Sequence, residues 1–77
     1  MNNIDNSVCL RNFGEFIREG RERKKLYQYQ LASMLDISQT YYSLIERGER
    51  NVDLVLAMEI CRALDLDLSR YIQIYMK

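Results

Sequence analysis

Histidine and proline are absent from this chain of 77 residues, and cysteine and glycine are rare, with two and three copies. Without histidine, there is no Ser–His or Cys–His pair for nucleophilic catalysis. Three scattered glycines cannot form a glycine-rich phosphate loop, and two lone cysteines cannot supply the four ligands of a structural zinc site. We therefore expect a protein that is not an enzyme and that holds neither a metal nor a small-molecule cofactor.

Long hydrophobic runs are also missing. The longest uninterrupted apolar stretch covers residues 54–58, whereas a membrane-spanning helix needs about 20 apolar residues. No segment has the pattern of a secretory signal, and two unpaired thiols fit a reducing compartment. These features predict a cytoplasmic protein that makes no membrane contact.

The charges cancel, because 11 lysines and arginines face 11 aspartates and glutamates. A histone-like polycation is excluded, but a local basic face is not. A chain of this length forms one small domain that buries only roughly 60% of its unfolded surface. A partner subunit is therefore a plausible source of further stability.

The spacing of apolar residues predicts a compact all-α bundle of five helices, at about 10–25, 28–35, 39–47, 54–64 and 68–75. Ser38, Asp53 and Asp67 can cap three of them, and Gly48 stands where a left-handed stop is needed. In the fourth helix, Leu54 is expected to face inward. Residues 1–7 are polar and turn-prone and predict a flexible N-terminal arm. We expect this arm to cover residues 1–9, which leaves 10–77 as a single domain.

The segment 28–48 is the most informative part of the chain. Two helices of about eight residues, joined by three or four residues, must cross sharply, as in a helix-turn-helix whose second helix enters a DNA major groove. The strings QYQLASMLDIS (28–38) and YYSLIERGERN (41–51) resemble the Cro and phage-repressor type of helix-turn-helix regulators, also called XRE-like or lambda-repressor-like. The resemblance covers about residues 13–72. The chain departs from the family pattern at Lys25 and Asp36, where the family usually has glycine.

Within this family, the run 46–52 followed by Ile60 and Cys61 is similar to the small dimeric controller proteins of restriction–modification systems. The resemblance implies a sequence-specific transcription regulator of double-stranded DNA. It also implies that Arg21 and Glu46 form a partly buried structural ion pair, so that Glu46 is not a catalytic acid. Tyr42 is expected in the core.

The resemblance places base-reading side chains on the third helix. Gln39 and Thr40 open it, and Ser43 and Leu44 follow one turn later. The alternative is that the first two are ordinary polar surface residues and that Leu44 packs on the second helix. Contacts with DNA phosphates are expected from residues at both ends of the motif, namely Gln28, Tyr41, Arg47, Arg50 and Asn51. Tyr41 could instead close the gap to the second helix, and Arg50 could pair with Glu46 or Glu49.

The only basic concentration covers Arg18, Arg21 and residues 23–25. Such a run is usually a solvated face, but on this fold it would border the phosphate path.

Apolar residues that fall outside the expected core predict a homodimer. They lie on the fourth and fifth helices, at Val55, Leu56, Met58, Ile72, Ile74 and Tyr75. A symmetric pair would place two reading helices about 34 Å apart over an inverted repeat. The alternative is that these residues only close a small core. A competing interpretation is an antitoxin-like or other protein-interaction module, whose apolar C-terminal face covers a partner and for which DNA binding is secondary.

Overall fold

A computed structural model describes residues 6–75 of the chain. Five α-helices follow one another in this part, with no strand among them: α1 (Asn6–Arg23), α2 (Gln28–Met34), α3 (Gln39–Glu46), α4 (Leu54–Ala63) and α5 (Leu68–Tyr75). The expected all-α architecture of five helices is confirmed. No helix within the described range is both long and apolar enough to cross a bilayer.

Side-chain caps set the starts of three helices. Ser38 Oγ accepts a hydrogen bond from the Tyr41 amide at 3.1 Å, and Asp53 Oδ1 accepts from the Leu56 amide at 2.8 Å. Asp67 Oδ1 accepts from the Ser69 amide at 3.0 Å. Each bond satisfies one of the first-turn N–H groups that have no partner within the helix. The caps predicted at these positions are confirmed.

Residues in the left-handed backbone region follow the helix ends. They are Lys25, Asp36, Gly48 and Asp65, with φ values between 56° and 73°. Only Gly48 has the residue type that this region favours, although aspartate tolerates it better than most side chains do. These residues stop the helices and reverse the chain within a few positions.

One hydrophobic core joins all five helices. Its most deeply buried side chains come from the first four, namely Ile17, Leu31, Tyr42, Ile45 and Ile60, and α5 adds Tyr71. Tyr42 is completely buried, as predicted. The aromatic rings of Phe13 and Tyr71 meet edge to face at 5.5 Å and connect α5 to α1.

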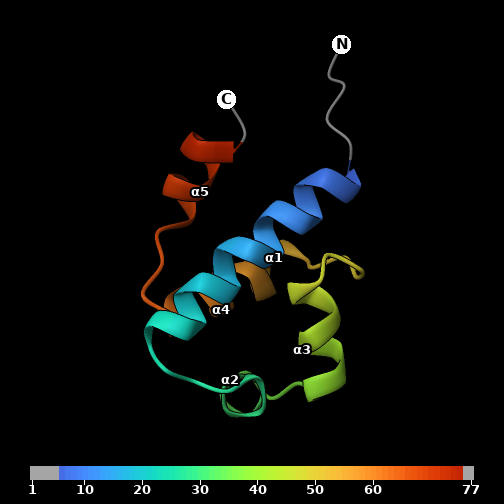
Figure 1. Ribbon diagram of the computed structural model, residues 1–77, viewed down its shortest axis with the longest axis vertical. Helices are drawn as coiled ribbons and strands as arrows, with labels where there is room; N and C mark the ends of the chain where they lie inside the picture. The colour runs from blue at the N-terminus through green and yellow to red at the C-terminus, as the bar shows by residue number, and fades with distance from the viewer. Residues whose placement is uncertain (1–5, 76–77) are drawn as a thin grey trace.

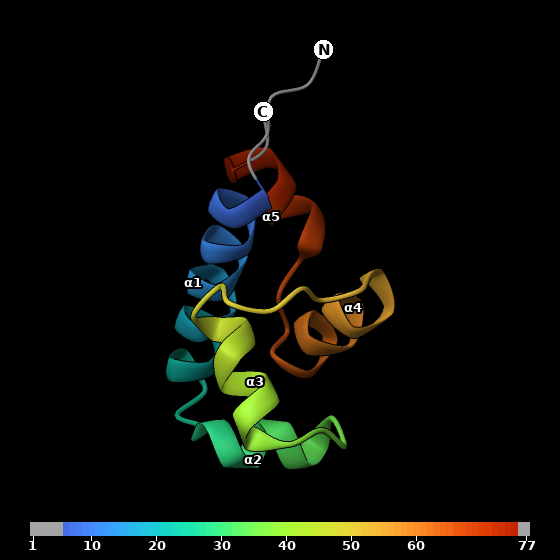
Figure 2. The same ribbon diagram turned by 90° about the vertical axis from the view of Figure 1, so that its right-hand side faces the viewer.

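The helices are arranged along one long axis (Figures 1 and 2). In both views α1 extends along the body, α2 lies at one end next to the start of α3, and α5 lies at the other end. Residues 35–38 alone connect α2 to α3. This short connection gives the sharp corner of a helix-turn-helix.

The predicted N-terminal arm is too long. Residues 6–9 already belong to α1, and residues 1–5 lie outside the described residues. The early start has a tertiary cause, because the Tyr71 hydroxyl donates a hydrogen bond to the Cys9 carbonyl at 3.0 Å. This contact fixes the first turns of α1 against α5.

The inward face of α4 also differs from the prediction. Leu54, expected inside, has 67% of its surface exposed, whereas Leu56, expected on a dimer face, is 8% exposed and belongs to the core. Ile60 defines the inward direction of α4. At 3.6 residues per turn, Leu56 lies one turn before Ile60 on the same side, and Leu54 lies about 120° away around the helix.

Candidate nucleic-acid interface

The helix α3 presents its first turn to solvent. Gln39 and Thr40 are exposed, and Ser43 and Leu44 on the next turn are half-buried. The opposite side of α3 carries Tyr42 and Ile45 into the core. The first turn on the outer side of α3 is therefore open to an external ligand, and the next turn is partly accessible.

The inner end of α3 is held by a single carboxylate. Arg21 donates to Glu46 from Nε at 2.6 Å and from Nη2 at 3.1 Å. Gln28 Nε2 donates to Glu46 Oε1 at 2.9 Å, and the Tyr42 hydroxyl donates to Oε2 at 2.5 Å. The Glu46 network, as we call these four residues, thus joins α1, α2 and α3, and it contains the ion pair expected from the family resemblance.

Burial and hydrogen bonding compete at this carboxylate. Burial disfavours the charged form of Glu46, but the hydrogen bonds from Arg21, Tyr42 and Gln28 outweigh it and lower its pKa below the ordinary value. The hydrogen bond to Glu46 raises the pKa of Arg21. Burial, followed by the bond to Glu46, raises the pKa of Tyr42. All three groups therefore keep their ordinary charge states at neutral pH.

A close backbone contact fixes α1 against the end of α3. A Cβ atom at Gly14 would lie 2.2 Å from the Glu46 carbonyl oxygen and 2.9 Å from that of Ile45. A Cβ atom at Gly48, which has φ +73°, would lie 2.7 Å from the Arg11 Cα atom. Only glycine fits at these two positions, so the distance between α1 and the end of α3 is set by the backbones themselves.

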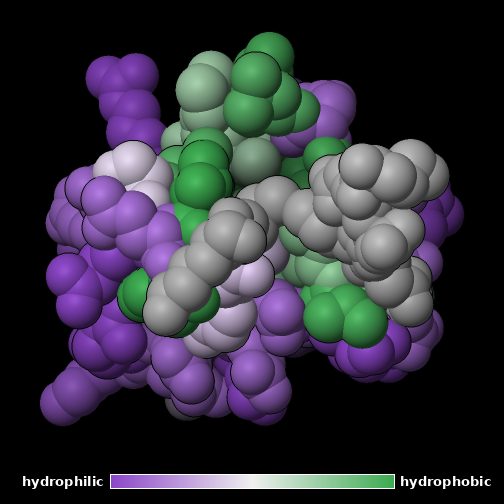
Figure 3. Space-filling model, turned by 90° about the horizontal axis from the view of Figure 1, so that it is seen from above, coloured by the Kyte–Doolittle hydropathy of each residue, from purple (hydrophilic) through white to green (hydrophobic). Residues whose placement is uncertain are grey.

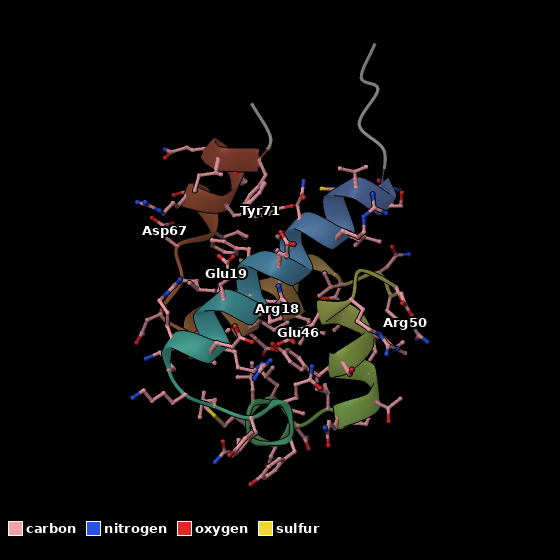
Figure 4. The ribbon with its side chains drawn as sticks, viewed as in Figure 1. Arg18, Glu19, Glu46, Arg50, Asp67 and Tyr71 are labelled. Atoms are coloured by element: carbon pink, nitrogen blue, oxygen red, sulfur yellow. The ribbon has the colours of Figure 1, made fainter. Side chains whose placement is uncertain are left out.

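The residues expected at the phosphates lie around α3. Gln28 is half-buried because its amide belongs to the Glu46 network, while Arg47, Arg50 and Asn51 are exposed. The Arg47 guanidinium lies 3.4 Å from the Glu49 carboxylate. Tyr41 turns its ring toward Arg50, whose guanidinium carbon lies 5.4 Å from the ring centre. Figure 4 labels Arg50 on the segment that follows α3.

Most of the apolar residues predicted for a dimer face are exposed on α4 and α5. Val55, Met58, Ile72 and Ile74 have 48–61% of their surface exposed, and Tyr75 has 37%. Among them, Ile72 also lines an apolar hollow of about 350 Å³, whose other lining residues are Cys9, Leu10, Phe13, Val52, Leu54, Ala57, Leu68 and Tyr71. Figure 3 shows hydrophobic residues gathered at the α5 end of the molecule. Of the six residues predicted for a dimer face, only Leu56 is inaccessible.

A polar groove lies between α1 and α3, and it was not predicted from the sequence. It has a volume of about 420 Å³ and is lined by Arg11, Glu15, Arg18, Arg21, Gln28, Ser43, Glu46 and Arg47. Residues 11, 15 and 18 follow the helical spacing of a single outward face of α1, which is the signal that could have pointed to them. The predicted basic run, by contrast, is divided. Arg21 belongs to the Glu46 network and Lys24 pairs with Asp65.

Within residues 6–75, no group of three or more histidine, cysteine, aspartate or glutamate side chains is arranged to hold a metal ion.

Comparisons with known proteins agree with this geometry. The family model described as helix-turn-helix (HTH_3) matches residues 17–71. The control protein C.MunI of a Mycoplasma species is 40% identical over 65 residues, which cover 83% of this chain and 86% of that protein. The crystal structure of the restriction-modification controller protein C.AhdI from Aeromonas hydrophila superposes with a TM-score of 0.79 at 35% identity, over 88% of this chain and 99% of that one. The first relative is named a control protein and the second a controller protein.

Proposed function

The chain belongs to the helix-turn-helix family of DNA-binding transcription regulators, and we propose that it acts as a homodimer on an inverted-repeat operator. The observation that carries this proposal is the placement of α3. Its polar side is open to solvent, while its other side is fixed by the core and the Glu46 network. A helix held in this way can enter a major groove without a change of fold.

On this proposal, side chains on the exposed side of α3 contact the bases. A glutamine amide can make a bidentate contact with adenine, and a threonine offers both a hydroxyl and a methyl group. Gln39 and Thr40 stand in the first turn, where recognition helices contact base edges. Ser43 and Leu44, one turn later, are accessible enough to add a hydrogen bond and an apolar contact with a thymine methyl group.

The flanking residues would hold the phosphates on either side of α3. Gln28 Nε2 carries two hydrogens and gives only one to Glu46, so the second can reach a phosphate oxygen. Arg47, Arg50 and Asn51 extend from the other end of the motif. The ring of Tyr41 supports Arg50, and its hydroxyl is a further phosphate donor.

The homodimer follows from the apolar surface of α4 and α5. Val55, Met58, Ile72, Ile74 and Tyr75 expose hydrophobic area that a second copy would remove from water. A twofold axis through this surface would bring the same patch of both copies together, as isologous interfaces require. Two α3 helices would then read half-sites about one turn of DNA apart.

The regulated genes belong, on this proposal, to a restriction–modification system. The support is the similarity to C.MunI and C.AhdI, one a control protein and the other a restriction-modification controller by name. A regulator of bacterial genes works in the cytoplasm. On this proposal, regulation would come from occupying the operator.

Selection of DNA sites in vitro, followed by anisotropy titration, tests the proposal. We expect a palindromic site that binds two chains, and a single half-site that binds far more weakly. Gln39→Ala is expected to cost about 1–3 kcal/mol on the selected site and to relax the base preference at one position. Gln73→Ala, which removes an exposed glutamine of α5, is the matched control. Failure to enrich any site, or equal losses on selected and random DNA, would refute sequence reading by α3.

A further inference from the structure

The groove between α1 and α3 concentrates one kind of side chain. The chain has eight arginines, at 11, 18, 21, 23, 47, 50, 62 and 70, and four of them line this groove. In Figure 4, Arg18 and Glu46 are labelled close together where α1 passes α3. A chain with no net charge has thus gathered half of its arginines at one place.

The charges in the groove do not cancel. Arg21 and Glu46 neutralise each other in the Glu46 network. Arg47 pairs with Glu49 beside the groove. Arg11 and Arg18 then face Glu15 alone among the groove residues, which leaves one positive charge in excess. Within residues 6–75, neither Arg11 nor Arg18 pairs with a carboxylate, although Glu15 lies between them on the same face of α1. Two guanidinium groups are therefore free to bind an anion.

The groove continues the surface assigned to DNA. Gln28, Ser43 and Arg47 line it, and each is also one of the DNA contacts proposed above. A guanidinium presents its donors in a planar fork that matches two phosphate oxygens. We propose that Arg18 and Arg11 bind phosphates of the DNA backbone, so that α1 forms a second positioning surface beside α3. This inference rests on the proposed DNA-binding function.

Backbone contacts place these arginines at a fixed distance from α3. Gly48 lies against the backbone of Arg11, and Gly14 lies against the carbonyl of Glu46. Neither contact leaves room for α1 to move closer to α3. The backbone that carries Arg11 and Arg18 is therefore already in place before DNA binds, so that less conformational entropy is lost on binding.

The inference predicts a salt signature for Arg18→Ala. Each phosphate contact contributes about 0.9 to the slope of log affinity against log salt concentration. Loss of one contact therefore weakens binding about eightfold at about 0.1 M salt, and this loss becomes smaller as the salt concentration rises. The loss should be equal on selected and random duplexes, because a phosphate contact carries no sequence information. Arg18→Lys should keep the slope, since it keeps the charge.

Arg62→Ala is the charge-matched control for Arg18→Ala, and Glu59→Gln is the charge-matched control for a second test, Glu15→Gln. Arg62→Ala removes an exposed arginine of α4 that lines a different hollow, and it should leave the salt slope unchanged. Glu15→Gln removes the only unpaired carboxylate of the groove and should tighten binding about two- to fivefold. Glu59→Gln, on α4, makes the same change of net charge outside the groove and should have little effect.

Equal salt slopes for Arg18→Ala, Arg62→Ala and the wild type would overturn the inference, as would equal effects of Glu15→Gln and Glu59→Gln. The proposed function fails by a different result, which is the loss of sequence preference in the wild type. Even if the wild type has no sequence preference, the slope of log affinity against log salt on random DNA still tests whether Arg18 contacts a phosphate. Thermal melts of the Arg18 variants should match the wild type, because Arg18 makes no ion pair within the described residues.

Discussion

Substitution of the buried Glu46 is expected to be costly, although it removes only one carboxylate. In Glu46→Ala, the Arg21 guanidinium loses both bonds to the carboxylate while its side chain stays 11% exposed. Arg21 Nη1 keeps its bond to the Leu26 carbonyl at 2.7 Å, which holds the charge inside the fold. The completely buried Tyr42 loses the acceptor of its hydroxyl.

The size of the effect follows from these contacts. Removing one partner of a buried ion pair costs about 3–5 kcal/mol, because the other charge remains without compensation. A chain of 77 residues has a total stability of about 4–12 kcal/mol, so Glu46→Ala consumes a large part of it. Tyr42→Phe should cost less, about 1.5–3 kcal/mol, since Arg21 and Gln28 still satisfy the carboxylate.

Urea unfolding followed by circular dichroism measures both variants. The chain concentration must be held constant, because dimerisation would add to the apparent stability. The double variant Arg21→Met with Glu46→Leu is expected to be more stable than Glu46→Ala, since no buried charge is left alone. A cost below about 1 kcal/mol for Glu46→Ala would show that water solvates Arg21. The Glu46 network would then not hold α3 as we argue.

Two further predictions concern the same junction of helices. The hydrogen bonds to Glu46 lower its pKa below the ordinary 4.5, so its stabilising contribution is fully present above about pH 4.5 and is lost as the pH falls through the folded-state pKa. The urea concentration at the midpoint of unfolding should therefore fall less on acidification in Glu46→Gln than in the wild type. Equal falls in the two proteins would contradict this. Gly14→Ala would press a Cβ atom against backbone atoms of α3 and should cost about 3 kcal/mol or more. Gly20→Ala meets only the flexible end of Leu66 and gains about 1 kcal/mol of helix propensity. Thermal melts of the two variants should differ clearly, and equal melting temperatures would mean that α1 can shift away from α3.

Local sequence was sufficient to predict most of the helices. The starts of α3, α4 and α5 follow from Ser38, Asp53 and Asp67, because a cap depends only on the residues of one turn. The length of the connection 35–38 then dictates the sharp corner. The pairing of Arg21 with Glu46 came from the family resemblance, since nothing local relates two residues 25 positions apart.

The features that the sequence did not predict depend on contacts between distant segments. The early start of α1 needs the bond from Tyr71 to Cys9, across 62 residues. The burial of Leu56 is an exception, because it follows from the position of Leu56 one turn before the inward-facing Ile60 on the same side of α4. Arg18 and Ser43 line the same groove because Gly14 lets α1 approach Glu46 closely, and no spacing within α1 can indicate this approach.

The Glu46 network also couples stability to recognition. One carboxylate fixes Arg21 of α1, Gln28 of α2 and Tyr42 of α3, and Gln28 is one of the proposed phosphate contacts. A change at Glu46 should therefore reduce both the stability and the affinity for any DNA, whereas Gln39→Ala should change base preference at unchanged stability, because Gln39 is exposed and lies outside the Glu46 network. If the affinity for DNA fell only as far as the stability fell, in both the Glu46 and the Gln39 variants, then α3 would contribute rigidity to the complex and would not read bases.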